Sequence, residues 1–171
     1  LVAAESGWYL APLRLLAFEI FDRLNQRGVL CNLLTGEEHI TIPGANITAA
    51  TVEMFSPIHS GTCVVIDEAQ MLADADRGWA WTRAVMEAEA ANIQVIGPQT
   101  VHGLIEQMAN AAAIPLEVVE HERLAPIRIA DSHWSLETIP SRTILVAFSR
   151  ALVLHLKTEL ERMKRTVSVV Y

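Results

Sequence analysis

Two adjacent carboxylates, Asp67 and Glu68, follow the apolar run Val64-Val65-Ile66. Such a run predicts a buried parallel strand, and ligands of open α/β sheets bind at the carboxyl ends of the strands. Nucleotide hydrolases use this arrangement to hold Mg²⁺ with the first carboxylate and to orient the attacking water with the second. Alone, the pair is equally consistent with acidic residues that begin a turn or cap the next helix. The surrounding segments have to decide between the two interpretations.

Other residues with recognisable chemistry are few. Cys31 and Cys63 show no Cys-x-x-Cys spacing and lie in or beside apolar strand patterns, which predicts buried free thiols rather than metal ligands or a disulfide. An unrelated metal-dependent α/β hydrolase that uses Asp67 and Glu68 directly is a further alternative. It would need more carboxylate or histidine ligands at other strand ends, and the sequence offers no such set.

The composition is that of a globular chain. Its 171 residues are enough for one domain with a sizeable core, or for one domain and part of another. Hydrophobic residues make up 51% and charged residues 19%, which excludes an intrinsically disordered chain. No apolar run is long enough to span a membrane, and we expect an intracellular protein. The net charge of −7 argues against a surface that is basic all over, but a local nucleic-acid groove needs only a few well-placed arginines.

Strand and helix patterns alternate around the carboxylate pair. Predicted strands cover 8–11, 29–34, 47–51, 64–66, 93–96 and 116–119, and predicted helices cover 13–24, 79–88 and 101–108, with Gly28 ending the first helix. This order is typical of an α/β fold with a parallel, doubly wound sheet. Beyond Pro126 the pattern changes. Predicted strands at 144–148 and 167–170 flank a helix through 152–163, which indicates the beginning of a second domain.

The ordered motifs resemble the superfamily 2 helicases, and most closely the mitochondrial degradosome RNA helicase family with its alphaproteobacterial relatives. The most specific segments are Asp67-Glu68-Ala69-Gln70, the Asp-Glu-x-Gln motif of many helicases, and Arg77-Gly78-Trp79-Ala80-Trp81-Thr82-Arg83, which is narrow to this family. Further similar segments are 9–14 (motif Ia), 34–38, 51–54 (Thr-x-Glu), 97–99 (motif III), 121–127 (inter-domain crossing) and 146–150 (motif IV). The resemblance implies a RecA-like parallel sheet flanked by helices, followed by the start of a second RecA-like domain.

The resemblance also implies roles for individual residues. Asp67 would hold Mg²⁺ through water and Glu68 would orient the hydrolytic water as a base. Gln70, and Gln99 of motif III, would sense the nucleotide. The implied nucleic-acid contacts, made to the backbone of a single strand, are Pro12, Arg14, Thr35, Gly36, Thr51, Glu53, Ser149 and Arg150. Thr35, Thr51 and Gln99 are also ordinary turn residues, and an arginine opening a helix is by default a solvated charge.

One motif of the family is missing from these 171 residues. A Walker A loop needs a Gly-rich backbone and a lysine for the phosphates, yet the only lysines are Lys157 and Lys164, and neither follows a glycine. We therefore interpret the chain as the middle of a helicase. It would hold an incomplete first RecA-like domain over 1–130, a linker over 131–142 and the start of a second domain over 143–171. From the family topology we expect a gap in the sheet beside the Asp67 strand.

The resemblance implies part of an ATP-dependent helicase that acts on RNA, or on RNA and DNA, and couples ATP hydrolysis to single-strand translocation and duplex unwinding. ATP and Mg²⁺ would be the cofactors, and an exoribonuclease is a candidate partner in RNA degradation. The expected location is the bacterial cytoplasm, or the mitochondrion in a eukaryote, without membrane association. The fragment alone is expected to be inactive. The alternative is a catalytically dead, helicase-like module that only binds nucleic acid.

Overall fold

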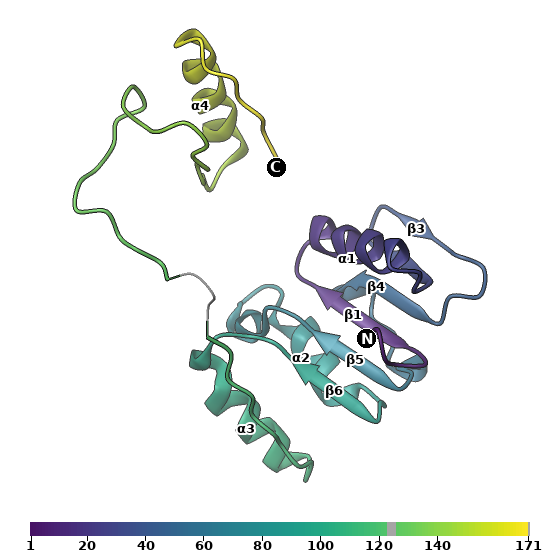
Figure 1. Cartoon of the computed structure of the whole chain (residues 1–171). Coiled ribbons are helices and arrows are strands. Elements are labelled where there is room, and N and C mark those ends of the chain that lie inside the picture. Colours follow the sequence, from purple (N-terminus) through teal and green to yellow (C-terminus); the bar gives the residue numbers. More distant parts are fainter. Residues whose placement is uncertain (123–125, 171) are drawn as a thin grey trace. The chain divides into compact units, whose positions relative to one another are not determined.

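The computed structural model describes residues 1–122 and 126–170 (Figure 1). The chain divides into two compact units, Leu1–Val118 and Val119–Tyr171. The first unit holds the sheet and three α-helices, and the second holds helix α4 (Arg150–Arg162). The predicted inter-domain segment 121–127 includes residues 123–125, which lie outside the described residues. The domain limits predicted from the sequence therefore stay a prediction.

A six-stranded sheet forms the centre of the first unit, with the strand order β3-β2-β4-β1-β5-β6. The strands are β1 (Gly7–Ala11), β2 (Cys31–Leu34), β3 (His39–Ile40), β4 (Ile47–Thr51), β5 (Cys63–Ile66) and β6 (Asn92–Val95). Only the short edge pair of β2 and β3 is antiparallel, and the other described pairs are parallel. The α/β class with a largely parallel sheet, predicted from the alternating pattern, is confirmed.

Alternate residues of the central strands pack against helices on opposite faces of the sheet. Leu10 of β1 and Ile66 of β5 share a buried cluster with Trp81 of helix α2 (Gly78–Glu87). Their neighbours Tyr9 and Val65 belong to a second cluster with helix α1 (Arg14–Gln26), which contributes Ala17. Because successive strand side chains point to opposite faces, both faces of the sheet have to be apolar. Helix α3 (His102–Ala111) follows β6 through the turn η4 (Gln99–Val101).

Three predicted strands do not form. The segments 116–119, 144–148 and 167–170 are apolar but have no strand structure. Val119 is 65% exposed, and in the second unit Ile144 and Phe148 are 88% and 100% exposed. A strand needs a neighbour for its backbone hydrogen bonds, and among the described residues of the second unit no strand is present to supply one. The apolar runs alone indicated strands, but they carried no information about pairing partners.

The expected gap beside the Asp67 strand is also wrong. Strand β5 pairs with β1 on one side, from Gly7↔Cys63 to Leu10↔Ile66, and with β6 on the other, from Cys63↔Asn92 to Ile66↔Val95. The sheet is therefore continuous through its centre. The described edge strands are β3 and β6, and Ile93 and Val95 of β6 are half-buried.

The two cysteines are free and buried, as the sequence predicted. Cys31 is fully buried, and burial raises the pKa of its thiol to about 11, so the thiol remains protonated at neutral pH. Within the described parts of the chain, no helix has both the length and the apolar character needed to cross a bilayer.

Gly78 opens α2 where the helix passes close to the preceding chain. A Cβ at this position would lie 2.6 Å from the backbone oxygen of Leu72, whereas a Cβ on Gly103 of α3 would meet nothing within 4 Å. We expect Gly78→Ala to lower the free energy of unfolding by about 1–3 kcal/mol through overpacking. Gly103→Ala, the matched control, should raise it by up to about 1 kcal/mol. Urea unfolding followed by tryptophan fluorescence measures both, and an unchanged Gly78→Ala stability would contradict the packing described here.

Candidate active site

The carboxyl ends of the parallel strands meet at one edge of the sheet. The register pairs Ala11 with Thr51 and Leu10 with Ile66, so the residues that follow these strands emerge side by side. Asp67 follows β5 directly, Pro12 follows β1, and Thr51 is the last residue of β4. The fold thus brings the predicted hydrolytic residues and several predicted nucleic-acid contacts to the same edge.

Asp67 is held by partners from three elements. The Tyr9 hydroxyl of β1 donates to Asp67 Oδ2, and the backbone N–H of Glu68 donates to Oδ1 at 2.9 Å. The backbone of Asp67 is fixed as well, since its N–H donates to the Leu10 carbonyl at 2.9 Å and its carbonyl accepts from Trp81 Nε1 at 2.9 Å. The carboxylate therefore has a defined orientation at the end of β5.

Glu68 has a left-handed backbone conformation, with φ 53° and ψ 50°. This conformation costs a non-glycine residue about 1–3 kcal/mol and is concentrated at functional sites. It turns the chain sharply from β5 into the 3-10 helix η3 (Ala69–Ala73) and leaves the Glu68 side chain half-buried. Gln70 Nε2 donates to Glu68 Oε2, so the amide of the Asp-Glu-x-Gln motif holds the carboxylate of the same motif.

The segment after β6 lies against this turn. Ala69 N–H donates to the Ile96 carbonyl at 2.8 Å, and a Cβ at Gly97 would lie 3.1 Å from the Ala69 Cβ. A glycine at position 97 permits this close approach. Gln99 begins η4 and is exposed. The structure brings the predicted motif III segment beside the Asp-Glu-x-Gln turn, while the role of Gln99 itself stays a prediction.

The predicted nucleic-acid residue Thr35 is buried and organises its own turn. Its hydroxyl accepts from the backbone N–H groups of Glu37 at 3.3 Å and Glu38 at 3.0 Å. Gly36 in the same turn is exposed. Arg14, at the start of α1, forms an ion pair with Glu37, and both side chains are more than half exposed. The ion pair brings Arg14 to the 35–38 turn, in which Thr35 is buried and Gly36 is exposed.

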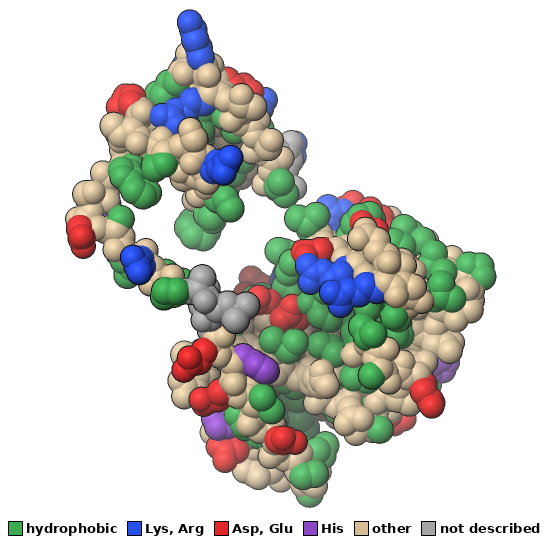
Figure 2. Space-filling model, in the orientation of Figure 1, with side chains coloured by type: hydrophobic (Ala, Val, Ile, Leu, Met, Phe, Trp, Pro, Cys, Tyr) green, Lys and Arg blue, Asp and Glu red, His purple; other side chains and the backbone are tan. Residues whose placement is uncertain are grey.

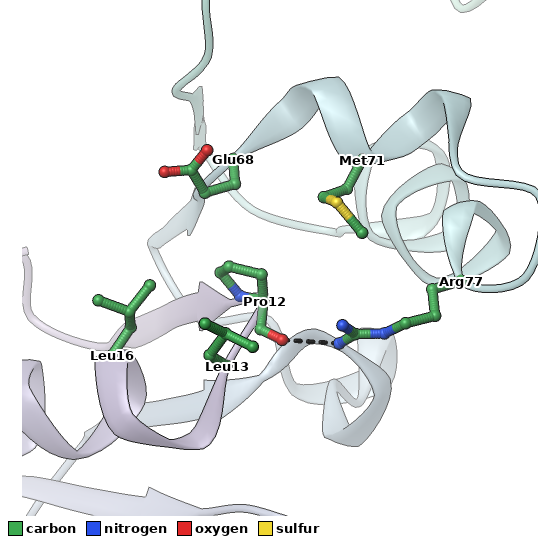
Figure 3. Close-up of a pocket in the computed structure, with 6 residues that line it drawn as sticks. All are labelled: Pro12, Leu13, Leu16, Glu68, Met71 and Arg77. Atoms are coloured by element: carbon green, nitrogen blue, oxygen red, sulfur yellow. Dashed lines mark hydrogen bonds between the residues drawn. The ribbon is translucent and has the colours of Figure 1, made fainter. Parts of the chain in front are cut away.

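Arg77 joins two further predicted contacts. Its Nη2 donates to the Pro12 carbonyl at 2.7 Å, and its Nε donates to Glu53 Oε1 at 2.8 Å. Figure 3 shows the hydrogen bond from the guanidinium to the Pro12 carbonyl, and both residues line a cavity of about 330 Å³ together with Glu68 and Met71. The Glu53 carboxylate is therefore paired with the Arg77 guanidinium.

Ser149 and Arg150 lie in the second unit, at the start of α4. The Ser149 hydroxyl accepts from the Leu152 N–H at 3.2 Å, which makes it the N-cap of this helix. Arg150 is the first residue of the helix. Their proposed contact with nucleic acid remains a prediction.

Tyr9 and Arg77 were not assigned a role from the sequence. Tyr9 pairs with Val65 in the β1–β5 register, so Tyr9 and Asp67 share one face of the sheet at diagonal positions. The two apolar runs do not state this register, so the contact appears only in the structure. Arg77 lies in the family-specific run Arg77–Arg83. A charged side chain in a run that packs against the core is the signal that could have identified it.

The oxygens of the Asp67 carboxylate fit the binding of a hydrated Mg²⁺ ion. An ionised carboxylate has about four lone-pair sites, and the two bonds to Asp67 leave capacity on both oxygens. Mg²⁺ is usually bound through one or two carboxylates, several waters and the phosphates of a substrate. In the described part of the chain no cluster of three or more His, Cys, Asp or Glu side chains forms a metal site. Asp67, whose carboxylate oxygens keep this capacity, would hold the ion through water.

The surface charge of the first unit is mixed. On the face shown in Figure 2, basic side chains lie next to acidic ones, with hydrophobic side chains exposed between them. This distribution agrees with the net charge of −7. Binding of a nucleic acid here would rest on a few oriented donors rather than on a broad basic surface.

The chain is similar to one well-defined group of proteins. A family model described as the DEXQ-box helicase domain of Suv3 matches residues 1–121. The "ATP-dependent RNA helicase SUV3L, mitochondrial" of Oryza sativa subsp. japonica is 38% identical over 99% of this chain and 23% of its own length. The protein named SUV3 from Saccharomyces paradoxus is 36% identical over 100% and 24%, and human SUPV3L1 is 35% identical over 99% and 22%. The chain thus spans less than a quarter of these relatives.

The bond from Tyr9 to Asp67 should be visible in the pH dependence of stability. Burial, and then the hydrogen bond to Asp67, raise the pKa of Tyr9 far above its usual value. The unfolded chain loses this proton at about pH 10, so the contribution of Tyr9 to stability is present below that pH and is lost as the pH rises further. Tyr9→Phe should be less stable by roughly 1–3 kcal/mol at neutral pH. The difference should shrink above about pH 10.

Urea unfolding of both proteins across this pH range measures the difference. Cys31, whose pKa of about 11 affects an overlapping range, is present in both and cancels. A stability difference that stays constant with pH would show that Tyr9 titrates normally.

Proposed function

Because this chain belongs to the Suv3 family of DEXQ-box helicase domains, we propose that it forms the ATP-hydrolysing and strand-contacting middle of an ATP-dependent RNA helicase. One observation carries the proposal. The Asp67-Glu68-Ala69-Gln70 turn lies at the same sheet edge as Pro12 and Thr51. When hydrolytic groups and nucleic-acid contacts lie at one rigid edge of the sheet, ATP hydrolysis can be coupled to movement along the nucleic acid.

The two carboxylates have different proposed roles because their surroundings differ. Asp67, fixed by Tyr9 and the Glu68 N–H, would hold Mg²⁺ through water. The ion would neutralise charge on the phosphates of ATP. Glu68 would accept the proton of the attacking water as a general base, and Gln70 would keep the Glu68 carboxylate in place. Gln99, from the segment beside this turn, would sense the nucleotide together with Gln70.

We propose nucleic-acid contacts at Pro12, Arg14, Thr35, Gly36, Thr51 and Glu53 of the first unit and, separately, at Ser149 and Arg150 of the second. Hydroxyl, guanidinium and backbone N–H groups contact phosphates without reading bases. Unwinding should therefore be largely independent of sequence, and the 2′-hydroxyl would supply any preference for RNA over DNA. Glu53 takes part indirectly, because its carboxylate is neutralised by Arg77.

The names of the relatives extend the proposal beyond this chain. They are called mitochondrial RNA helicases, which supports an RNA substrate and, in a eukaryote, a mitochondrial location. A bacterial source would place the protein in the cytoplasm. An exoribonuclease that degrades the unwound strand is the partner we propose. We keep the domain limits 1–130, 131–142 and 143–171 as part of the proposal.

Substitution of the two carboxylates in the full-length protein tests the assignment. Glu68→Gln keeps size and hydrogen bonding but removes the base, so ATP and RNA should still bind while hydrolysis falls by at least about 10²-fold and unwinding stops. Asp67→Ala should instead weaken the binding of Mg²⁺-ATP. Glu106→Gln, an exposed carboxylate on α3, is the control and should change neither. Nucleotide affinity and turnover are measured separately for each variant.

Near-normal hydrolysis in Glu68→Gln would reject Glu68 as the base. A full-length protein that binds RNA but hydrolyses no ATP would favour the non-catalytic binding module.

The 171-residue chain alone should show no ATP turnover, with or without RNA. Its only lysines, Lys157 and Lys164, lie in and just after α4, and neither belongs to a Gly-rich loop that could surround the phosphates. A phosphate-release assay on repurified chain measures this, with the full-length protein as the positive control. Turnover that survives repurification would contradict the prediction.

A further inference from the structure

Arg77 connects the ends of two strands that belong to the proposed RNA path. Its Nη2 donates to the Pro12 carbonyl at 2.7 Å, at the turn after β1. The same guanidinium forms an ion pair with Glu53 Oε1, at 2.7 Å from Nη2, in the 3-10 helix η1 (Val52–Met54) after β4. One planar group thus fixes the distance between the Pro12 turn and the Thr-x-Glu segment.

A second set of contacts connects Arg77 with the hydrolytic turn, Asp67-Glu68-Ala69-Gln70. The guanidinium carbon lies 5.4 Å from the centre of the Trp81 ring. Trp81 is completely buried, and its Nε1 donates to the Asp67 carbonyl at 2.9 Å. Only one side chain therefore separates Arg77 from the backbone of the proposed Mg²⁺ ligand. Arg77 and Glu68 also line the same cavity (Figure 3).

The chemistry of this position requires arginine. A guanidinium has five N–H donors in a rigid plane, so it can bond a carbonyl, pair with a carboxylate and stack on an indole at the same time. A lysine ammonium has one centre and no planar face. The pair with Glu53 also neutralises a carboxylate that would otherwise repel the phosphates of a strand lying across this loop.

We propose that Arg77 is a positioning residue that couples occupancy of the RNA path at Pro12 and Glu53 to the hydrolytic turn at Asp67 and Glu68. The inference rests on the proposed function and deepens it, because it assigns the step that makes hydrolysis respond to RNA to Arg77, for which the resemblance implied no individual role. RNA that contacts the Pro12 turn would shift Arg77, and Arg77 would transmit the shift through Trp81 to Asp67.

Arg83 lies within α2, whereas Arg77 directly precedes this helix, and Arg83 provides a matched comparison. Its Nη2 donates to the carbonyls of Glu53 at 3.2 Å and Phe55 at 2.8 Å. Its guanidinium lies over Trp79, which is 55% exposed. Arg83 thus binds backbone carbonyls in and beside the η1 segment, and none of its described hydrogen bonds or ring contacts involves Trp81 or Asp67. Its loss should affect stability more than coupling.

The experiment compares Arg77→Gln, Arg77→Lys and Arg83→Gln in the full-length protein. ATP turnover is measured without RNA and with saturating single-stranded polyuridylate, and the melting temperature is recorded for each variant. We expect the ratio of stimulated to unstimulated turnover to fall about tenfold in Arg77→Gln, a size typical of coupling between two sites. Arg77→Lys should show a smaller loss. Arg83→Gln should lower the melting temperature and keep the ratio.

An unchanged ratio in Arg77→Gln would overturn the inference, and so would an equal loss of the ratio in Arg83→Gln, since both arginines would then act only through stability. If Arg77→Gln does not fold, Arg77→Lys decides by the same ratio, because it retains the charge beside Glu53. Wild-type protein without RNA-stimulated hydrolysis would overturn the proposed function, and the inference with it, before any variant is compared.

Discussion

Parallel pairing of β1 with both β4 and β5 is the constraint on which the site depends. In one register, Gly7 opposes Ile47 on one side and Cys63 on the other, so the three strands end at the same level. Gly7 permits this pairing, because a Cβ there would lie 1.9 Å from the Cys63 carbonyl oxygen. A shift of one residue would move every side chain to the opposite face and would separate Asp67 from Tyr9. The chemistry at the sheet edge is therefore fixed by hydrogen bonds within the core.

The ion pairs of the first unit differ in what they contribute. Arg14 with Glu37 and Arg23 with Glu19 are more than half exposed, and such pairs contribute about 0–1 kcal/mol. Arg77 and Glu53 have side chains only 37% and 30% exposed, and Arg77 adds the Pro12 carbonyl and the Trp81 ring to the pair. Hydrogen bonds to charged groups contribute about 1.5–3 kcal/mol, so Arg77 outweighs the surface pairs. It organises the loops as well as stabilising them.

The sequence was sufficient for the parts of the fold in which local pattern and partner agree. The apolar runs of β1, β5 and β6 lie beside one another in the sheet, and each was predicted to within one or two residues. The segments 144–148 and 167–170 have equally apolar runs, yet neither pairs with another strand. Hydrophobic periodicity records which side chains avoid water, but a strand also requires a neighbour for its N–H and carbonyl groups.

The same limit explains what could be predicted of the site. Asp67, Glu68 and Gln70 were found because their motif is contiguous, and the structure joins them within one turn. Tyr9 and Arg77 contact that turn or its neighbours from positions 58 and 65 residues away from their partners Asp67 and Pro12, so no local pattern connects them. Their roles depend on the strand register and on the packing of α2, and neither can be derived from the sequence alone.

The contacts around the turn hold the two carboxylates in different ways. Asp67 is bound through its side chain by Tyr9 and through its backbone by Leu10 and Trp81, all from the packed core. The Glu68 side chain is held by Gln70, which is itself exposed, and its backbone is in a strained left-handed conformation. A group that holds a metal ion benefits from a fixed position, since reorganisation costs free energy at each turnover. In the proposed assignment Glu68 is the base, and its carboxylate is then oriented by Gln70 and by the left-handed turn that leads into the buried Ala69. A left-handed non-glycine residue of this kind persists where the surrounding structure holds it.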